Sequence, residues 1–167
     1  MRTFLIGGAL GALVLALAAC GSSSASSTSQ QSLQRQADLW AVDQIEKNFH
    51  KAISRKDIGV MMSLWAPNAT LTLGPGRTAA GKNQIRQFWL KKSKNFKPAY
   101  HKVSETPAYK VRITVNGDRG TLYFECHYVD VITHEFGPIT AADMDVARID
   151  GRWLITNMVG ASARLSP

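Results

Sequence analysis

The strongest constraint on the fold is a β-hairpin near the C-terminus, predicted for residues 139–148 and 153–159 around Asp150-Gly151. Asp-Gly between two β-prone segments favours a two-residue turn, because both central positions of that turn need positive φ. The first arm carries Asp143 and Asp145, and their spacing places both carboxylates on one face of the strand. These acids face either solvent or a cavity, and much of the functional question depends on which.

The rest of the chain from residue 33 predicts helices followed by strands. A first helix is predicted over residues 33–55, Asp57 is a good N-cap for a second, and residues 83–92 form a third. Alternating segments between residues 100 and 133 predict further strands. This order indicates an α+β domain in which helices pack on one face of a curved antiparallel sheet of five or six strands. The buried face of the first helix is predicted to carry Val42, Ile45, Phe49, Ala52 and Ile53.

The N-terminus resembles a bacterial lipoprotein signal. A short positive start precedes an apolar run over residues 4–18, which is too short for a stable membrane span, and small residues precede Cys20. In such signals the cysteine is diacylated and becomes the first residue after cleavage. We therefore predict a signal peptide over residues 1–19 and a membrane anchor at Cys20. The alternatives are an ordinary secretory peptide with an accidental cysteine, or a signal anchor.

The predicted lipoprotein would have a Ser-rich tether over residues 20–35 and a folded domain over residues 36–164. Residues 21–32 have no apolar side chains to bury, so we expect a flexible coil with a mean reach of roughly 20 Å. The expected location is the extracytoplasmic side of the cell envelope, on the outer membrane if the cell has two membranes.

Cysteine content and charge argue against a disulfide framework, a metal site and a nucleic-acid partner. With Cys20 lipidated, Cys126 has no partner for an intramolecular disulfide, and its strand pattern predicts a small buried hydrophobe. The four histidines show no ligand spacing with it, so we expect neither a metal nor another cofactor. The net charge of +8 suits a solvated basic face, anionic lipid or a cell-wall polymer, and we expect no nucleic-acid partner outside the membrane.

Four segments resemble, in the right order, the SnoaL-like, ketosteroid-isomerase-like group of the nuclear transport factor 2 superfamily. They cover residues 49–57, 61–71, 81–89 and 149–155. The resemblance implies a cone-shaped, cystatin-like α+β barrel, with the sheet wrapped around three N-terminal helices and a mostly apolar pocket open at one end. Members include isomerases, cyclases, dehydratases and epoxide hydrolases as well as binding or dimerisation modules, so the fold does not determine the function.

The isomerase chemistry of that family transfers poorly to this sequence. It uses a tyrosine in the first helix, a carboxylate base at the end of the first strand and a protonated strand acid; the corresponding residues here are Phe49, Leu73 and Asp145. We therefore expect a module that binds a small apolar molecule or mediates an interaction, including a homodimer through the sheet. The alternative is a lipid-anchored isomerase, dehydratase or hydrolase on an apolar substrate, using Asp145 and His127.

The resemblance and the strand alternation together predict which residues line the pocket. The predicted polar residues are Tyr123, His127, Asp145 and Asn157. The predicted pocket wall consists of Phe49, Met61, Trp65, Leu73 and Trp89.

The lipoprotein prediction is tested by Cys20→Ala. We expect a fatty-acid analogue to label the wild-type chain in the producing cell and to leave the variant unlabelled, because only the cysteine can form the thioether. Labelling that persists in the variant contradicts the prediction.

Overall fold

The structure is a computed structural model that describes residues 23–104 and 110–164; the predicted signal peptide and Cys20 lie outside the described residues. The helical elements are α1 (Ser23–Arg55), α2 (Ile58–Ser63), α3 (Lys82–Gln87), the π-helical η1 (Phe88–Lys92) and the 3₁₀ turn η2 (Lys94–Phe96). The strands are β1 (Trp65–Thr72), β2 (Thr78–Ala80), β3 (Lys102–Val103), β4 (Lys110–Asn116), β5 (Arg119–Cys126), β6 (Val129–Asp130), β7 (Thr140–Ile149) and β8 (Arg152–Ala161).

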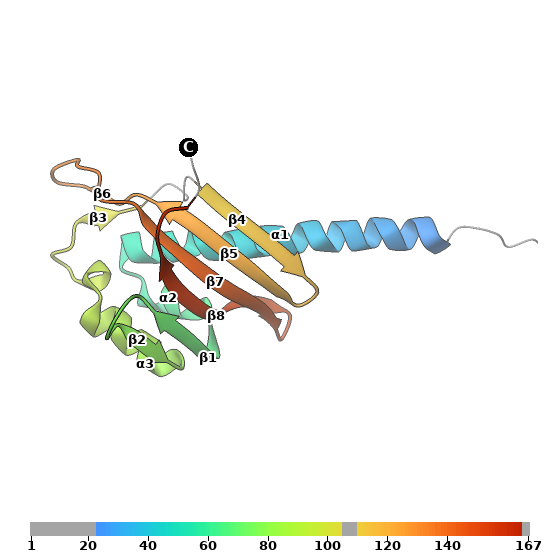
Figure 1. The fold of residues 1–167 in the computed structure, drawn as a ribbon, viewed down its shortest axis with the longest axis horizontal. Helices are drawn as coiled ribbons and strands as arrows, with labels where there is room; N and C mark the ends of the chain where they lie inside the picture. Colours follow the sequence, from blue (N-terminus) through green and yellow to red (C-terminus); the bar gives the residue numbers. More distant parts are fainter. Residues whose placement is uncertain (1–22, 105–109, 165–167) are drawn as a thin grey trace, which may run out of the picture.

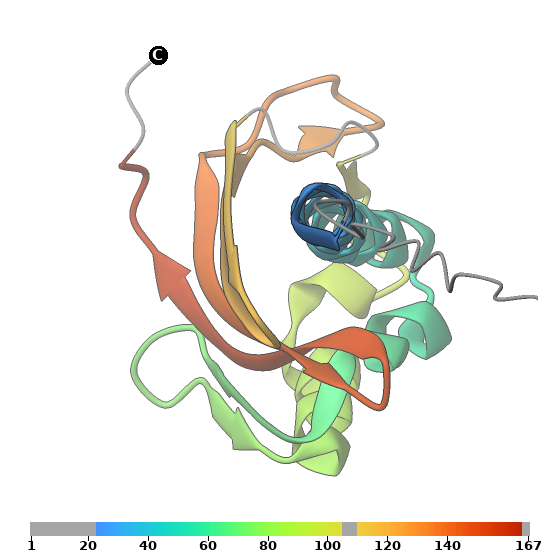
Figure 2. The same cartoon turned by 90° about the vertical axis from the view of Figure 1, so that its right-hand side faces the viewer.

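The predicted α+β architecture is confirmed, with a correction to the strand directions. Six strands form one curved sheet in the order β2-β1-β8-β7-β5-β4, while β3 and β6 pair separately. All neighbours in the six-stranded sheet are antiparallel except β1 and β8, which are parallel, so the sheet is mixed. The sheet keeps two edges, β2 and β4, and does not close into a barrel. Figure 2 shows it curving around α1.

Helix α1 lies in the concave face of the sheet because one of its faces is apolar. The five residues predicted for that face are all buried, with exposed fractions of 0–3 %. They pack in one core with inward-facing residues of the sheet such as Leu122, Phe124 and Met144. Burying each large apolar side chain contributes about 1.5–3 kcal/mol.

Helix α1 begins ten residues earlier than predicted. The stretch expected to be coil is helical from Ser23, and residues 28–37 have exposed side chains. This part of α1 projects beyond the sheet (Figure 1). Serine, threonine and glutamine are tolerated in helices, and extending an existing helix avoids the cost of nucleation. At 1.5 Å per residue, residues 23–37 correspond to about 22 Å of helix. No helix within the described residues is both long and apolar enough to cross a membrane.

The predicted C-terminal hairpin is confirmed. Asp150 and Gly151 connect β7 to β8 with φ values of 50° and 74°, as the turn requires. The pairing shifts by one residue between Asp145 and Val146, which leaves Thr156 of β8 as the extra residue of a β-bulge.

A buried carboxylate joins α1 to this hairpin. Asp38 is 6 % exposed and accepts hydrogen bonds from Arg148 at 2.6 Å and from the indole nitrogen of Trp153 at 3.2 Å. Gln34 donates a third bond at 3.0 Å. Burial acts to raise the pKa of the Asp38 carboxyl, but these hydrogen bonds and the charge of Arg148 outweigh it and lower the pKa. Asp38 therefore fixes where α1 lies on the sheet.

We expect Asp38→Asn to reduce the free energy of unfolding by about 1–3 kcal/mol, because Arg148 loses its buried carboxylate partner and keeps only the exposed Asp118. Urea unfolding measures the change, and Asp43→Asn, which removes a partly exposed carboxylate that pairs with Lys47 and Gln44 on α1, should cost much less. Since the Asp38 pKa is lowered, its contribution is present above the unfolded-state pKa and is lost as the pH falls through the folded-state value. The difference between wild type and Asp38→Asn should therefore shrink below about pH 4. Equal losses in the two variants contradict the assigned role of Asp38.

Candidate functional site

A cavity of about 530 Å³ lies between α1 and the sheet. Its apolar surface comes from elements far apart in the sequence: Phe49 and Ile53 of α1, Trp89 of η1, Phe124 of β5 and Met158 of β8. The aromatic rings pack edge to face or tilted, with the Phe49 centroid 5.7 Å from that of Trp89 and 5.8 Å from that of Phe124. Such packing gives a rigid wall suited to flat apolar groups.

Polar side chains complete the lining of this cavity. Arg77 follows β1, Asn95 lies in η2, and Tyr100, Tyr128 and Thr140 come from the segments around β3, β6 and β7. Arg77 is exposed, with its guanidinium carbon 5.9 Å from the centroid of the Phe88 ring. The contact orients the only guanidinium among the residues that line the cavity. The site thus combines an apolar floor with a polar, positively charged edge.

Three of the five residues predicted for the pocket wall lie at the cavity. Phe49, Leu73 and Trp89 line the cavity. Met61 and Trp65 are fully buried and are not among the lining residues, because α2 and the start of β1 pack into the solid part of the core.

None of the four predicted polar residues lines the cavity. Asp145 and Asn157 lie on the outer face of the sheet, opposite each other in the pairing of β7 with β8. Asn157 donates to Asp145 at 3.1 Å and accepts from Thr70 at 2.7 Å. Asp145 is exposed. Of the two alternatives for this acid, the structure shows the solvent-facing one.

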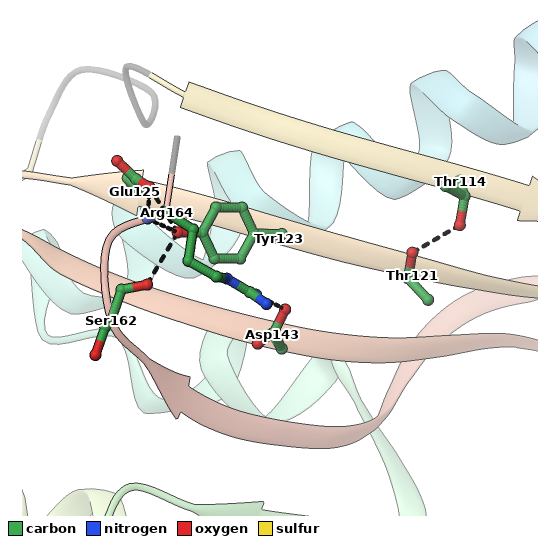
Figure 3. A network of polar contacts seen from close by, with 7 residues as sticks. All are labelled: Thr114, Thr121, Tyr123, Glu125, Asp143, Ser162 and Arg164. Atoms are coloured by element: carbon green, nitrogen blue, oxygen red, sulfur yellow. Dashed lines mark hydrogen bonds and ion pairs between the residues drawn. The ribbon is translucent and has the colours of Figure 1, made fainter. Parts of the chain in front are cut away.

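Tyr123 and Asp143 also belong to the outer face, where the C-terminal segment covers them (Figure 3). The Tyr123 hydroxyl donates to Glu125 at 2.6 Å, and the backbone N–H of Arg164 donates to the same carboxylate at 2.6 Å. The Arg164 side chain pairs with Asp143 and lies over the Tyr123 ring, 4.4 Å from its centroid. These residues hold residues 162–164 against the sheet and take no part in the cavity.

His127 follows β5 and contacts a neighbouring loop. Its Nδ1 lies 2.9 Å from the carbonyl oxygen of Gly137, and its ring centroid is 6.1 Å from that of Phe136. Neither His127 nor Asp145 lines the cavity, so the proposed acid-base pair has no access to a molecule bound there.

A different polar cluster was missed from the sequence. Glu46 and His50 lie one turn apart on α1, with exposed fractions of 0 % and 1 %, and the distance between Glu46 Oε1 and His50 Nε2 is 3.1 Å. The other ring nitrogen lies 3.4 Å from the hydroxyl of Tyr128, a residue that lines the cavity. Burial raises the pKa of Tyr128 well above its ordinary value. Positions 46 and 50 fall on the same helical face as Val42, Phe49 and Ile53. This spacing in the sequence could have predicted that Glu46 and His50 are buried.

A surface groove of similar volume runs over α3 and η1. Arg86, Lys91 and Lys92 line it together with polar side chains. Within residues 23–104 and 110–164, no three His, Cys, Asp or Glu side chains converge as metal ligands.

Comparison with known proteins identifies the family. The SnoaL-like domain profile matches residues 47–155, and the chain belongs to this family. No curated protein matches the sequence.

Solved structures share the cystatin-like fold. An NTF2-like protein from Novosphingobium aromaticivorans is 14 % identical with a TM-score of 0.66, and the match covers 84 % of this chain and 89 % of that one. A candidate scytalone dehydratase from the same species is 11 % identical with a TM-score of 0.63 over 80 % and 89 % of the two chains. A candidate ketosteroid isomerase from Shewanella frigidimarina is 17 % identical with a TM-score of 0.57 over 71 % and 92 %.

Cys126 should be chemically inert in the folded protein. It is 1 % exposed, and burial raises the pKa of its thiol to about 12. In a Cys20→Ala chain, in which Cys126 is the remaining cysteine, we expect Ellman's reagent at pH 8 to react only after unfolding in guanidinium. Rapid reaction of the folded variant contradicts the buried placement.

Proposed function

We propose that this protein is a lipid-anchored extracytoplasmic lipoprotein whose SnoaL-like domain binds a small, mainly apolar molecule. The observation that carries the proposal is the cavity of about 530 Å³ between α1 and the sheet, with its aromatic floor and polar edge. A volume of about 300–1,000 Å³ is typical of ligand sites, and this cavity combines aromatic walls with an exposed lining that is more polar than apolar.

The lining also indicates the kind of molecule. The rings of Phe49, Trp89 and Phe124 offer edges and faces to a flat apolar group. Arg77 at the exposed edge favours an acidic or strongly accepting group on the ligand. The names of two similar structures refer to ketosteroid and scytalone, which supports a small organic ligand in this fold.

The anchoring part of the proposal rests on the sequence around Cys20. Only two residues separate this cysteine from the start of α1 at Ser23. A lipid on Cys20 together with the projecting part of α1 would hold the cavity away from the membrane surface by up to about 22 Å. The cavity would then be open to molecules in the aqueous phase outside the membrane.

The ligand site is tested with 8-anilinonaphthalene-1-sulfonate, a flat apolar probe with one anionic group. In the lipid-free Cys20→Ala chain we expect saturable binding that Leu73→Trp weakens at least about tenfold, because the larger ring fills the cavity. Arg77→Gln should weaken binding severalfold through loss of the sulfonate partner. Fluorescence titration measures both effects.

The matched control is Val159→Trp. Val159 lies on the outer face, opposite Asp143 in the pairing of β7 with β8, and does not line the cavity. It should leave the probe affinity unchanged. Equal effects of Leu73→Trp and Val159→Trp, or no binding by the unsubstituted chain, count against the proposed site.

A further inference from the structure

The buried cluster of Glu46, His50 and Tyr128 suggests how one group of the ligand is recognised, and this inference rests on the proposed binding function. Glu46 and His50 lie behind the cavity wall, and Tyr128 forms part of that wall. The His50 ring is further enclosed by Phe124, whose centroid lies 4.8 Å from it in an edge-to-face arrangement. A carboxyl group and an imidazole are thus buried beside the proposed ligand.

Packing alone does not account for these side chains. Leucine or phenylalanine would fill the same face of α1 without removing an ionisable group from water, and burying a carboxylate is costly unless it is paired. Perturbed or buried ionisable groups beside a cavity are common at functional sites. The cluster is therefore a candidate for recognition of the ligand.

The contacts indicate which atoms of the cluster donate hydrogen bonds and which accept them. Glu46 Oε1 lies 3.1 Å from His50 Nε2, outside hydrogen-bond geometry but close enough for its negative charge to favour the tautomer with a proton on Nε2. In the neutral ring, Nδ1 is then an acceptor that faces the Tyr128 hydroxyl at 3.4 Å. With this tautomer the Tyr128 hydroxyl is the donor to Nδ1, which leaves the lone pairs of the phenol oxygen available to a ligand.

The neighbouring Cys126 thiol is compatible with a hydrogen bond from the Tyr128 hydroxyl to His50. The Cys126 thiol, which adjoins Tyr128 and Glu46, stays neutral because burial raises its pKa to about 12. Tyr128 and Cys126 also share a side-chain hydrogen bond in which the Tyr128 hydroxyl is the donor. Sulfur is only a weak acceptor, so it competes poorly with His50 Nδ1 for the hydroxyl proton.

We propose that Glu46 and His50 position Tyr128 as a hydrogen-bond acceptor for a ligand hydroxyl, so that the cavity selects apolar alcohols or phenols over the corresponding ethers. Tyr128 contacts the ligand, while His50 and Glu46 act through it as positioning residues. The proposal concerns binding and involves no covalent step.

Two probes of nearly equal shape test this selection. 1-Naphthol can donate a hydrogen bond, and 1-methoxynaphthalene can only accept one. Calorimetric titration of the lipid-free Cys20→Ala chain should give at least about tenfold tighter binding of the naphthol, because the ether leaves the acceptor oxygen of Tyr128 unpaired.

The variants separate recognition from folding. Tyr128→Phe should bring the ratio of the two dissociation constants close to one, because the acceptor oxygen is gone. His50→Leu should release the Tyr128 proton and improve binding of the ether, which reduces or reverses the ratio. A variant that merely loosens the fold weakens both probes together and leaves the ratio unchanged.

Two matched controls lie outside the cavity. Tyr123→Phe changes an equally buried tyrosine on the outer face, and His127→Leu changes a histidine in loop contact. In both variants the ratio of the dissociation constants of the ether and the naphthol should equal that of the unsubstituted protein.

The outcomes distinguish this inference from the proposed function. If both probes bind equally and Tyr128→Phe changes nothing, the selection by Tyr128 is overturned while the ligand site stands. Tighter binding of the ether also overturns it, because Tyr128 then acts as a donor. If neither probe binds, nor the anionic probe described above, the proposed function fails and this inference fails with it.

Discussion

The placement of α1 in the concave face of the sheet is the contact on which the rest of the structure depends. Two interactions fix it: an apolar stripe buried against the strands, and Asp38, which holds Arg148 and Trp153 of the hairpin. Between the helix and the curved sheet, side chains fill the space near α2 but leave a cavity near Phe49 and Ile53. The same packing that stabilises the domain therefore creates the site.

The sequence predicts the locally determined features of this fold well. The Asp150-Gly151 turn, the N-cap at Asp57 and the buried stripe of α1 depend on neighbours along the chain, and the structure confirms all three. The parallel pairing of β1 with β8 was missed, because it joins segments more than 80 residues apart and leaves no periodic signal. The start of α1 was missed because polar residues without a packing partner give no helical stripe.

The candidate site was predicted only in part, for a related reason. Alternation shows that Asp143 and Asp145 share a face, but it does not say whether that face is concave or convex. The family resemblance predicts a pocket near Phe49, Leu73 and Trp89, and these three residues line the cavity. The contact between His50 and Tyr128 spans 78 positions in the chain and becomes visible only when α1 lies in the sheet.

The central claim is that the cavity between α1 and the sheet holds a small molecule. Native mass spectrometry of the protein isolated from the producing cell tests it most directly, with Leu73→Trp and Val159→Trp prepared in parallel. We expect a noncovalent adduct of defined mass on the wild type and on Val159→Trp, and its loss from Leu73→Trp. The same adduct on all three proteins would place the ligand elsewhere, and a wild type without any adduct would contradict the claim.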